Sequence, residues 1–268
     1  MSPPDAQGWD CHAHVFGPYE RFPLAAERSY TPPEAVEADH AALLARLGLA
    51  HGVLVHPSAY GDDHSLLLHA LASNEALRGV VVVRPDSPLL AAEGGLAGLR
   101  GRGVRAARFS HRAGAGTNFS GSASFDDLRA LAPALADAGL HAELWTDCKT
   151  LPAIAQELRH FPFPVVIDHM GVFDVDAGID EPGFRALLDL LASGKVWVKL
   201  CAYRNLLKTP DPELGRAFQR KLIDANPEQL VWGSDWPHLN VKPAPDAAQL
   251  LRMFRDWTGD ARLERQIL

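Results

Sequence analysis

The feature that most constrains the fold of this chain is a regular alternation of apolar strand-like runs with helix-like stretches. Most of the runs are continuously apolar, which is typical of strands in a parallel sheet that is buried on both faces. Strands that alternate with helices in this way indicate an α/β fold. The strand-like runs are Trp9–Ala13, Gly52–His56, Val80–Arg84, Val104–Phe109, His141–Trp145, Pro164–Asp168, Val196–Leu200 and Gln229–Gly233.

Eight such units in 268 residues favour a (β/α)8 TIM barrel, a fold that typically takes about 250 residues. The alternative is a doubly wound open sheet. That fold would need no eighth strand and would usually carry a glycine-rich phosphate loop after a strand, and the sequence contains no such loop. No linker or shift in composition divides the chain, so we predict a single domain over residues 1–268.

Capping residues mark the start of three of the predicted helices. Ser124 precedes a stretch with an acidic residue three positions on, and Gly139 ends that stretch. Glu181 and Asp211 are each followed by a proline, the residue favoured at the first position of a helix. We therefore predict helices that begin after Ser124, Glu181 and Asp211.

Composition and charge exclude several classes of protein. With 47% hydrophobic and 22% charged residues the chain is neither disordered nor a coiled coil. No apolar run reaches the ~18 residues of a membrane helix, and a net charge of −7 argues against nucleic acid as a partner. Met1–Gly8 shows no secretory signal and three cysteines cannot form a disulfide framework, so we expect a cytoplasmic protein. The sequence is compatible with a homo-oligomer.

Histidine and aspartate side chains follow three of the predicted strands. His12 and His14 end the first strand at alternate positions and therefore share a face. His169 follows the sixth strand, and Asp235 follows the eighth, where a buried acid needs a partner or a role. The first and last strands of a closed barrel are neighbours, so we expect His12, His14 and Asp235 to converge. Two imidazoles there can bind a metal or polarise a carbonyl.

Three strings of residues resemble the amidohydrolase superfamily, and more closely its amidohydrolase-related lactonase branch, which includes 2-pyrone-4,6-dicarboxylate lactonases and sugar lactonases. They are Asp10-Cys11-His12-Ala13-His14, Ile167-Asp168-His169-Met170-Gly171 and Trp232-Gly233-Ser234-Asp235-Trp236-Pro237-His238. The resemblance runs from about Asp10 to the last residue. It implies a (β/α)8 barrel that hydrolyses a lactone, with Asp235 as the general base and with His12, His14 and His169 as an electrophilic cluster. Because the family usually continues past the last helix, we expect the C-terminus to be truncated.

The resemblance also bears on metal content. Some relatives work without a metal, whereas many superfamily members bind one or two divalent ions, the two-metal ones through a carboxylated lysine. The matching strand, Val104–Phe109, ends without lysine, so we expect no binuclear site. The expectation is either no metal or one divalent ion, with zinc the most plausible. The candidate ligands are His12, His14, His169 and Asp235.

Arginines at the predicted active face indicate an anionic substrate. Arg108 ends the fourth strand, Arg112 follows it, and Arg204 follows the seventh strand. A guanidinium group is planar and can hold a carboxylate with two hydrogen bonds. Trp145, at the end of the fifth strand, and His238, in the last string of the resemblance, complete the candidate substrate-binding residues. We expect the loops that carry the site at about residues 15–33, 110–123, 201–211 and 235–245.

The sequence therefore predicts a hydrolase that opens a small anionic lactone, such as a 2-pyrone-4,6-dicarboxylate-like or sugar-acid lactone, by water attack with Asp235 as the base. In the dicarboxylate lactonases an arginine follows the Asp-His-Met-Gly string, whereas this chain has Val172, so one contact with a dicarboxylate is missing. Two alternatives are a zinc-dependent decarboxylase of the same superfamily and a barrel that binds a sugar acid or lactone without turnover. The second is disfavoured because a binding protein needs no general base.

Overall fold

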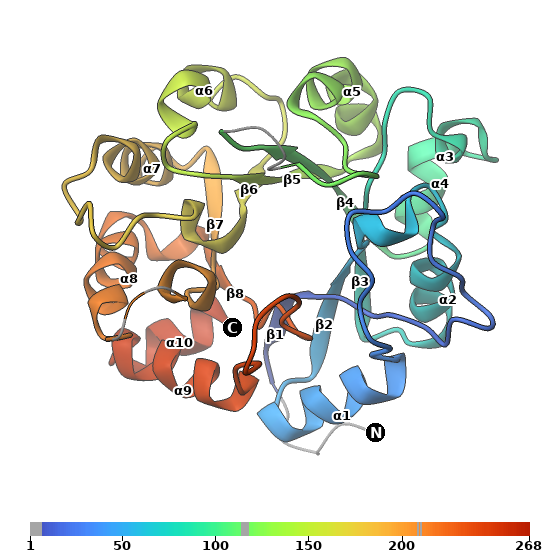
Figure 1. Cartoon of the computed structure of the whole chain (residues 1–268). Coiled ribbons are helices and arrows are strands. Elements are labelled where there is room, and N and C mark those ends of the chain that lie inside the picture. Colours follow the sequence, from blue (N-terminus) through green and yellow to red (C-terminus); the bar gives the residue numbers. More distant parts are fainter. Residues whose placement is uncertain (1–6, 114–117, 208, 210) are drawn as a thin grey trace.

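The computed structural model describes residues 7–113, 118–207, 209 and 211–268. In this part of the chain eight parallel strands pair in sequence order, from β1 to β8. The ring closes where Asp235 N donates to His12 O over 2.8 Å and His14 N donates to Trp236 O over 2.8 Å. The predicted (β/α)8 barrel is therefore confirmed (Figure 1). The strands are β1 (Trp9–Ala13), β2 (His51–Val55), β3 (Leu77–Val81), β4 (Val104–His111), β5 (His141–Thr146), β6 (Val165–Ile167), β7 (Val196–Leu200) and β8 (Leu230–Trp232).

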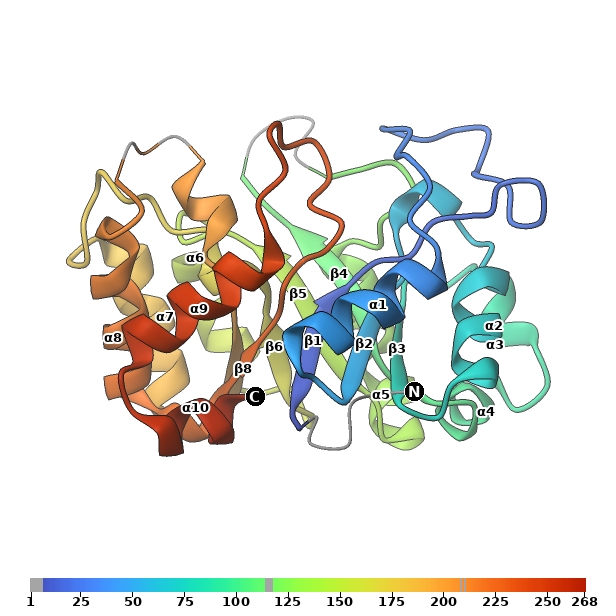
Figure 2. The ribbon, with the colours of Figure 1, turned by 90° about the horizontal axis from the view of Figure 1, so that it is seen from below.

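Helices surround the ring of strands, as Figure 1 shows. From the side, the long connections that follow the strands gather at one end of the barrel, the upper end in Figure 2. Among the described residues, none of the helices combines the length and apolar character that crossing a membrane requires. The helices are α1 (Glu37–Leu47), α2 (Ser65–Ser73), α3 (Pro88–Ala91), α4 (Gly95–Gly101), α5 (Phe125–Ala138), α6 (Leu151–Leu158), α7 (Pro182–Ala192), α8 (Leu214–Ala225), α9 (Ala247–Thr258) and α10 (Ala261–Ile267).

Two of the three predicted helix starts are confirmed by their capping hydrogen bonds. The Ser124 hydroxyl accepts from Asp127 N over 3.1 Å and the Asp127 carboxylate accepts from Ser124 N over 2.7 Å, which caps α5 from both sides. Gly139 ends α5 with a φ of 64°. The Glu181 carboxylate accepts from Phe184 N over 2.7 Å at the start of α7.

Several boundaries differ from the sequence prediction by a few residues, and two of these differences have a clear physical cause. The helix expected after Asp211 begins at Leu214, because the Asp211 carboxylate accepts from Glu213 N over 3.0 Å and forms a turn of its own before α8. The third strand ends at Val81. The apolar residues that follow it, Val82 and Val83, are buried in the core but lie outside the sheet. Burial in the core explains why these residues are apolar. The apolar run therefore placed the third strand at Val80–Arg84, a few residues after its observed position at Leu77–Val81.

The main hydrophobic core lies between the strands and the helices that cover them. Along α5 and α7 the buried residues recur at helical spacing, so each helix turns one apolar face to the sheet. Charged and polar side chains are buried as well, and several of them belong to the strands themselves. Glu143 of β5, Lys199 of β7 and His12 of β1 each expose 2% or less of their surface. Buried charges of this kind need partners, and these three lead to the functional site.

Candidate active site

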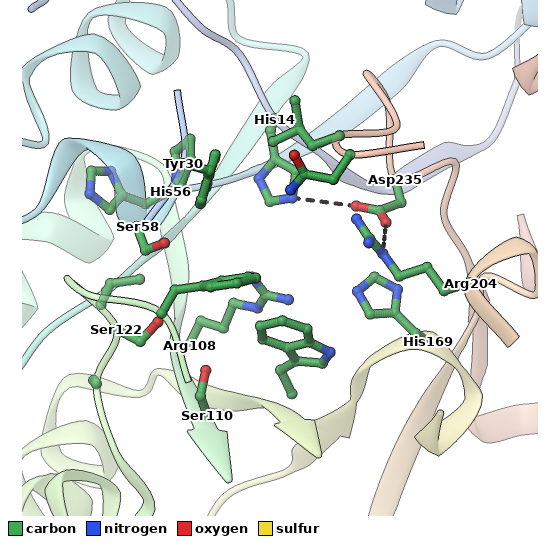
Figure 3. Close-up of a pocket in the computed structure, with 17 residues that line it drawn as sticks. His14, Tyr30, His56, Ser58, Arg108, Ser110, Ser122, His169, Arg204 and Asp235 are labelled. Atoms are coloured by element: carbon green, nitrogen blue, oxygen red, sulfur yellow. Dashed lines mark hydrogen bonds and ion pairs between the residues drawn. The ribbon is translucent and has the colours of Figure 1, made fainter. Parts of the chain in front are cut away.

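The carboxyl ends of the strands surround a pocket of about 620 Å³, part of which is open to solvent (Figure 3). Its walls combine imidazole, guanidinium and hydroxyl groups with aromatic rings and a single carboxylate. Such a lining suits a small polar anion better than an apolar ligand. The residues with polar side chains or aromatic rings are His14, Tyr30, His56, Ser58, Arg108, Ser110, Phe119, Ser122, Trp145, His169, Arg204, Asp235 and Asn240.

Asp235 follows β8 and has a φ of 56°, a left-handed conformation that is uncommon outside glycine. Two side chains fix one of its carboxylate oxygens. The Tyr203 hydroxyl donates to Oδ2 over 2.7 Å, and Arg204 Nε donates to the same atom. The other oxygen, Oδ1, faces His14 Nε2 at 3.4 Å and His12 Nε2 at 3.6 Å. One oxygen of Asp235 is thus held in place while the other stays open towards the histidines.

A glycine allows this close approach of the end of β8 to β1. A Cβ atom on Gly233 would lie 2.7 Å from His12 Cβ and 3.0 Å from His12 N, closer than real Cβ contacts come. The carboxylate of Asp10 binds the same turn, accepting from Ser234 N over 2.9 Å and from the Ser234 hydroxyl over 2.5 Å. The Gly-Ser-Asp sequence therefore sets the distance between Asp235 and His12.

The charges of the site follow from burial and from its cations. Burial alone would raise the pKa of Asp235, but Arg204 and the nearby imidazoles outweigh it and hold the pKa well below its ordinary range. Burial lowers the pKa of His169 to about 3 and lowers that of His12 well below its usual value. At neutral pH the site therefore contains an ionised Asp235 carboxylate beside neutral His12 and His169.

The side chain of His14 has a defined hydrogen position. Its Nδ1 lies 2.7 Å from Val55 O, and because a carbonyl oxygen can only accept, Nδ1 carries the hydrogen. In the neutral form of the ring, Nε2 has a lone pair, and it lies 3.4 Å from Asp235 Oδ1. Two acceptors at this separation are suited to share a water molecule or a cation.

His169 lies in a tight turn after β6, with a φ of 50°. Asn205 Nδ2 donates to His169 O over 3.0 Å and secures the turn from the segment after β7. The His169 ring lines the pocket, and its Nδ1 is buried without a hydrogen-bond partner among the described residues. A buried polar atom without a protein partner is a place for a water molecule or an ion.

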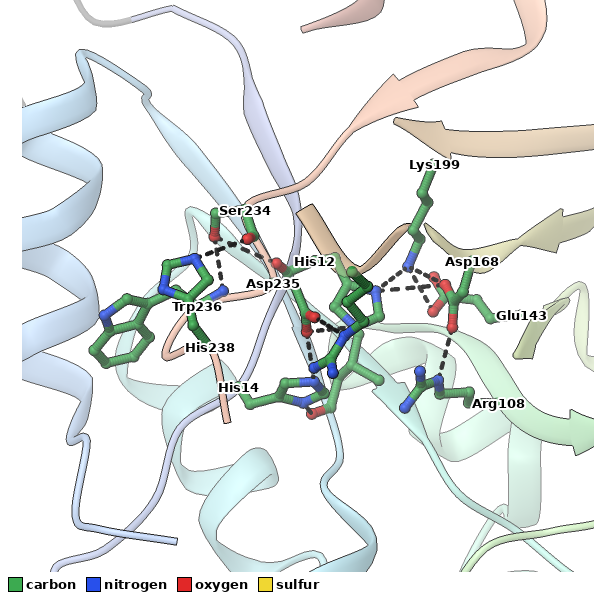
Figure 4. A network of polar contacts seen from close by, with 12 residues as sticks. His12, His14, Arg108, Glu143, Asp168, Lys199, Ser234, Asp235, Trp236 and His238 are labelled. Atoms are coloured by element: carbon green, nitrogen blue, oxygen red, sulfur yellow. Dashed lines mark hydrogen bonds and ion pairs between the residues drawn. The ribbon is translucent and has the colours of Figure 1, made fainter. Parts of the chain in front are cut away.

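Behind the pocket, a chain of buried charges connects four strands (Figure 4). Arg108 Nε donates to Asp168 Oδ2 over 2.8 Å, and Lys199 Nζ lies 2.7 Å from Glu143 Oε2 and 3.4 Å from Asp168 Oδ1. Lys199 also approaches His12 Nδ1 at 3.1 Å. The burial of Lys199 would lower its pKa, but Glu143 and Asp168 outweigh this effect and raise it, so the side chain is an ammonium ion.

The nine predicted site residues fall into four positions. Six of the nine line the pocket, and His12 lies beside Asp235 without reaching the pocket surface. Arg112 lines a neighbouring groove, where it approaches Asp147 at 3.7 Å and stacks over Trp145 at 4.8 Å. His238 is buried outside the pocket, with its Nε2 3.1 Å from Ser234 O. The six pocket residues are Asp235, His14, His169, Arg108, Arg204 and Trp145.

Several residues of the site were missed by sequence reasoning. Glu143 and Asp168 support Lys199, and Tyr203 binds Asp235. A charged residue within an otherwise apolar parallel strand is a usable signal, because it must be paired inside the fold. Glu143 carries that signal in the sequence. Tyr203 carries none, since a tyrosine after a strand is common.

Three groups of buried side chains in the described residues could hold a divalent metal, with ligand atoms within 4.8 Å of one another. A single-metal site is therefore compatible with the structure. The bare Nε2 of His14 and the free Oδ1 of Asp235 fit a metal by the chemistry of the donors. Burial raises the pKa of the Cys201 thiol well above its usual value, which makes the third group a poor one. The groups are His12, His14, Asp235; His12, Asp168, His169; and His169, Cys201, Asp235.

Comparison with known proteins shows which family the chain belongs to. The family model for amidohydrolases (Amidohydro_2) matches residues 9–268. The chain is 31% identical over 265 residues to 4-sulfomuconolactone hydrolase of Hydrogenophaga intermedia, covering 97% of this chain and 85% of that protein. It is also 31% identical over 271 residues to 2-pyrone-4,6-dicarboxylate hydrolase of Comamonas testosteroni, covering 97% and 86% respectively.

A solved structure agrees with both relatives. The crystal structure of a candidate 2-pyrone-4,6-dicarboxylic acid hydrolase from Pseudomonas putida superposes with a TM-score of 0.81 at 32% identity. The match covers 98% of this chain and 94% of that one. The similarity therefore extends over the whole barrel and includes every strand that carries a site residue.

Proposed function

This chain belongs to the amidohydrolase family, as its motifs predicted, and on that basis we propose that it hydrolyses a small anionic lactone. The observation that carries the proposal is that Asp235, whose Oδ1 has no hydrogen-bond partner among the described residues, lines the same pocket as Arg108 and Arg204. The two relatives described above are both named as hydrolases of lactones that carry anionic groups. A base and two cations in one pocket are what such a reaction requires.

The substrate is expected to carry a carboxylate or sulfonate group. Arg108 and Arg204 provide guanidinium groups, and the hydroxyl-bearing residues Tyr30, Ser58 and Ser122 add hydrogen-bond donors on the opposite wall (Figure 3). Val172 lines the groove next to the pocket and not the pocket itself. We infer that a second anionic group, where a substrate has one, is held by different contacts from those in the dicarboxylate lactonases.

In the proposed reaction, water attacks the lactone carbonyl. The water donates one hydrogen bond to Asp235 Oδ1 and one to His14 Nε2, which leaves an oxygen lone pair directed at the substrate. Asp235 takes a proton as the new C–O bond forms and returns it to the ring oxygen when the ring C–O bond breaks. The product is an open-chain acid with one added water.

Negative charge develops on the carbonyl oxygen during the attack. His169 and Arg204 both line the pocket beside Asp235, and their N–H groups can stabilise that charge without reorganisation. Arg108 fixes the anionic group of the substrate so that the carbonyl faces the water. A divalent metal held by His14 and Asp235 would supply Lewis-acid chemistry at this point.

The location of the protein is also a proposal. Its three cysteines, Cys11, Cys148 and Cys201, are all free thiols. Free thiols persist in a reducing compartment, and this supports the cytoplasm as the place where the enzyme acts.

A panel of lactones tests the proposed function. The panel contains 2-pyrone-4,6-dicarboxylate, 4-sulfomuconolactone, a sugar-acid lactone and a neutral lactone of similar size. We expect hydrolysis of at least one anionic member, with a product heavier by one water in the mass spectrum. Loss of carbon dioxide, abolished by a chelator, would instead favour the zinc-dependent decarboxylase. Binding of a lactone without any turnover would favour the non-catalytic barrel.

A further inference from the structure

Lys199 is the buried cation for which the proposed reaction has no use. It lies on β7, and its side chain exposes 2% of its surface. It does not line the active-site pocket, so it cannot contact a substrate there. Its ammonium group nevertheless reaches His12, one of the two histidines beside Asp235 (Figure 4). Burying an ammonium ion is costly, so its position requires an explanation.

The partners of Lys199 show which way its hydrogen atoms point. Two carboxylates, Glu143 at 2.7 Å and Asp168 at 3.4 Å, flank it and keep it charged. The contact with His12 Nδ1, at 3.1 Å, is shorter than the 3.4 Å that separates His12 Nδ1 from Asp168 Oδ1. An ammonium group has three hydrogens and no lone pair, so it can only donate.

This contact determines where the hydrogen of a neutral His12 lies. Since Lys199 donates to Nδ1, that nitrogen offers its lone pair, and the ring carries its hydrogen on Nε2. Nε2 is the nitrogen that faces Asp235 Oδ1 at 3.6 Å. A nitrogen that carries a hydrogen can donate to a carboxylate but cannot bind a metal ion.

We propose that Lys199 is a positioning residue that holds the hydrogen of His12 on Nε2, on the side of the ring that faces Asp235, and thereby makes His12 a poor ligand for a divalent metal. Within the candidate ligand group of His12, His14 and Asp235, the hydrogen on His12 Nε2 is then the one feature that does not fit a metal. His14, whose Nδ1 donates to Val55 O, has the opposite tautomer and presents a bare Nε2. Lys199 weakens the metal site through His12 alone.

The inference concerns the same cluster as the proposed function, but its test does not depend on lactone hydrolysis. The first measurement is the hydrogen position of His12 in the unmodified, metal-free protein. Nuclear magnetic resonance of isotope-labelled histidine distinguishes the two neutral tautomers, and a His12→Asn variant assigns the signals. We expect the hydrogen on Nε2. A hydrogen on Nδ1 would overturn the proposal.

The second measurement is zinc affinity, determined by competition with a chelating dye. Lys199→Met combined with Glu143→Gln removes one positive and one negative charge, so the net charge of the network is unchanged. We expect this double variant to bind zinc at least about tenfold more tightly than the parent, the lower end of the effect of residues that support metal ligands. The matched control, Glu143→Gln alone, keeps Lys199 and should show no gain. Equal zinc affinity in the double variant and the parent would overturn the proposal.

Discussion

Asp235 and His169, on which the proposed reaction most depends, both have left-handed backbone conformations, with φ values of 56° and 50°. Such conformations are sparsely populated by residues with a side chain, and they concentrate at functional sites. Each is held by a hydrogen bond from another segment, since His12 O accepts from Asp235 N and Asn205 donates to His169 O. The fold therefore fixes these two side chains in positions that their own backbone preferences disfavour.

The sequence predicted the convergence of His12, His14 and Asp235 because strand order alone brings β1 and β8 together. It also placed Arg108 at the end of the fourth strand and Arg112 after it. The fourth strand continues to His111, so Arg108 lies on the strand and lines the pocket, whereas Arg112 lies beyond its end and turns to the neighbouring groove. The partners of Asp235 were not predictable, because they depend on how the turn after β7 is folded.

Substitution of Arg108 by lysine tests its proposed role with the anionic group of the substrate. Lysine keeps the charge that Asp168 needs but lacks the planar pair of donors. We expect Arg108→Lys to lower kcat/KM about tenfold for an anionic lactone, a loss at the low end for hydrogen bonds to charged groups. For a neutral lactone the loss should be smaller.

The same substitution at Arg112 provides the comparison, because its side chain lies in the neighbouring groove. Steady-state kinetics on both lactones should show a smaller loss for Arg112→Lys than for Arg108→Lys. If Arg108→Lys lowers kcat/KM equally for the anionic and the neutral lactone, Arg108 supports the fold and does not select the substrate.

The pH dependence of kcat/KM reports the base of the free enzyme. The pKa of Asp235 lies well below its ordinary range, after Arg204 outweighs the effect of burial, so its carboxylate form persists as the pH falls. Burial also keeps His169 neutral until about pH 3. We therefore expect no acidic loss of activity from Asp235 or His169 between about pH 8 and pH 5. A loss centred between about pH 6 and pH 7 that remains in the Asp235→Asn variant would report another histidine that must be neutral for the reaction.

At the scale of elements, the backbone of α7 packs closely against the backbone of the segment that follows β5. A Cβ atom on Gly183, in the first turn of α7, would lie 1.8 Å from Cys148 O. The Gly183→Ala variant must therefore displace backbone, and we expect it to lower the free energy of unfolding by about 3 kcal/mol or more. Urea denaturation measures this change.

Gly101, at the end of α4, is the matched control, because a Cβ atom there would meet nothing within 4 Å. Gly101→Ala should leave the free energy of unfolding unchanged or raise it by up to about 1 kcal/mol, as alanine favours a helix. Equal stability of both variants would show that α7 can move away from Cys148 without loss.

Elements with a local signal were predicted better than elements that depend on pairing. Both boundaries of α5 are set by residues next to the helix, since Ser124 caps one end and Gly139 caps the other. The end of β3 has no such mark. It is set by register with β2, where Val55 pairs with Val80, while the apolar run continues past the sheet. The ion pairs of Lys199 also depend on residues that are distant in the sequence, so their pairing could not be predicted.

At the scale of the whole molecule, buried histidines link stability to pH. Burial lowers the pKa of His40 to about 4, that of His141 to about 4 and that of His169 to about 3. As the pH falls below about 6.5, the unfolded chain takes up protons that the native state does not, so stability falls with pH. Asp10 and Glu143, whose pKa values burial raises, act in the opposite direction, but the histidines outnumber them.

His40 isolates this effect, because burial is the only cause of its pKa shift. Between about pH 7.5 and pH 5 the parent should lose stability, and the loss should be about 1–2 kcal/mol smaller in His40→Leu. Urea denaturation at both pH values measures the difference. The exposed His160 serves as the control, since His160→Gln should show the same loss as the parent. An unchanged loss in His40→Leu would refute the linkage.

The measurement that tests the central claim most directly is kcat of the parent and of Asp235→Asn on the best anionic lactone of the panel. Asparagine keeps the size of the side chain and can still bind Tyr203, but it cannot take a proton from water. We predict that Asp235→Asn still unfolds in a single cooperative transition, which shows that it is folded, and loses at least about 100-fold in kcat. A folded Asp235→Asn variant within a few-fold of the parent would show that the base lies elsewhere and contradict the account.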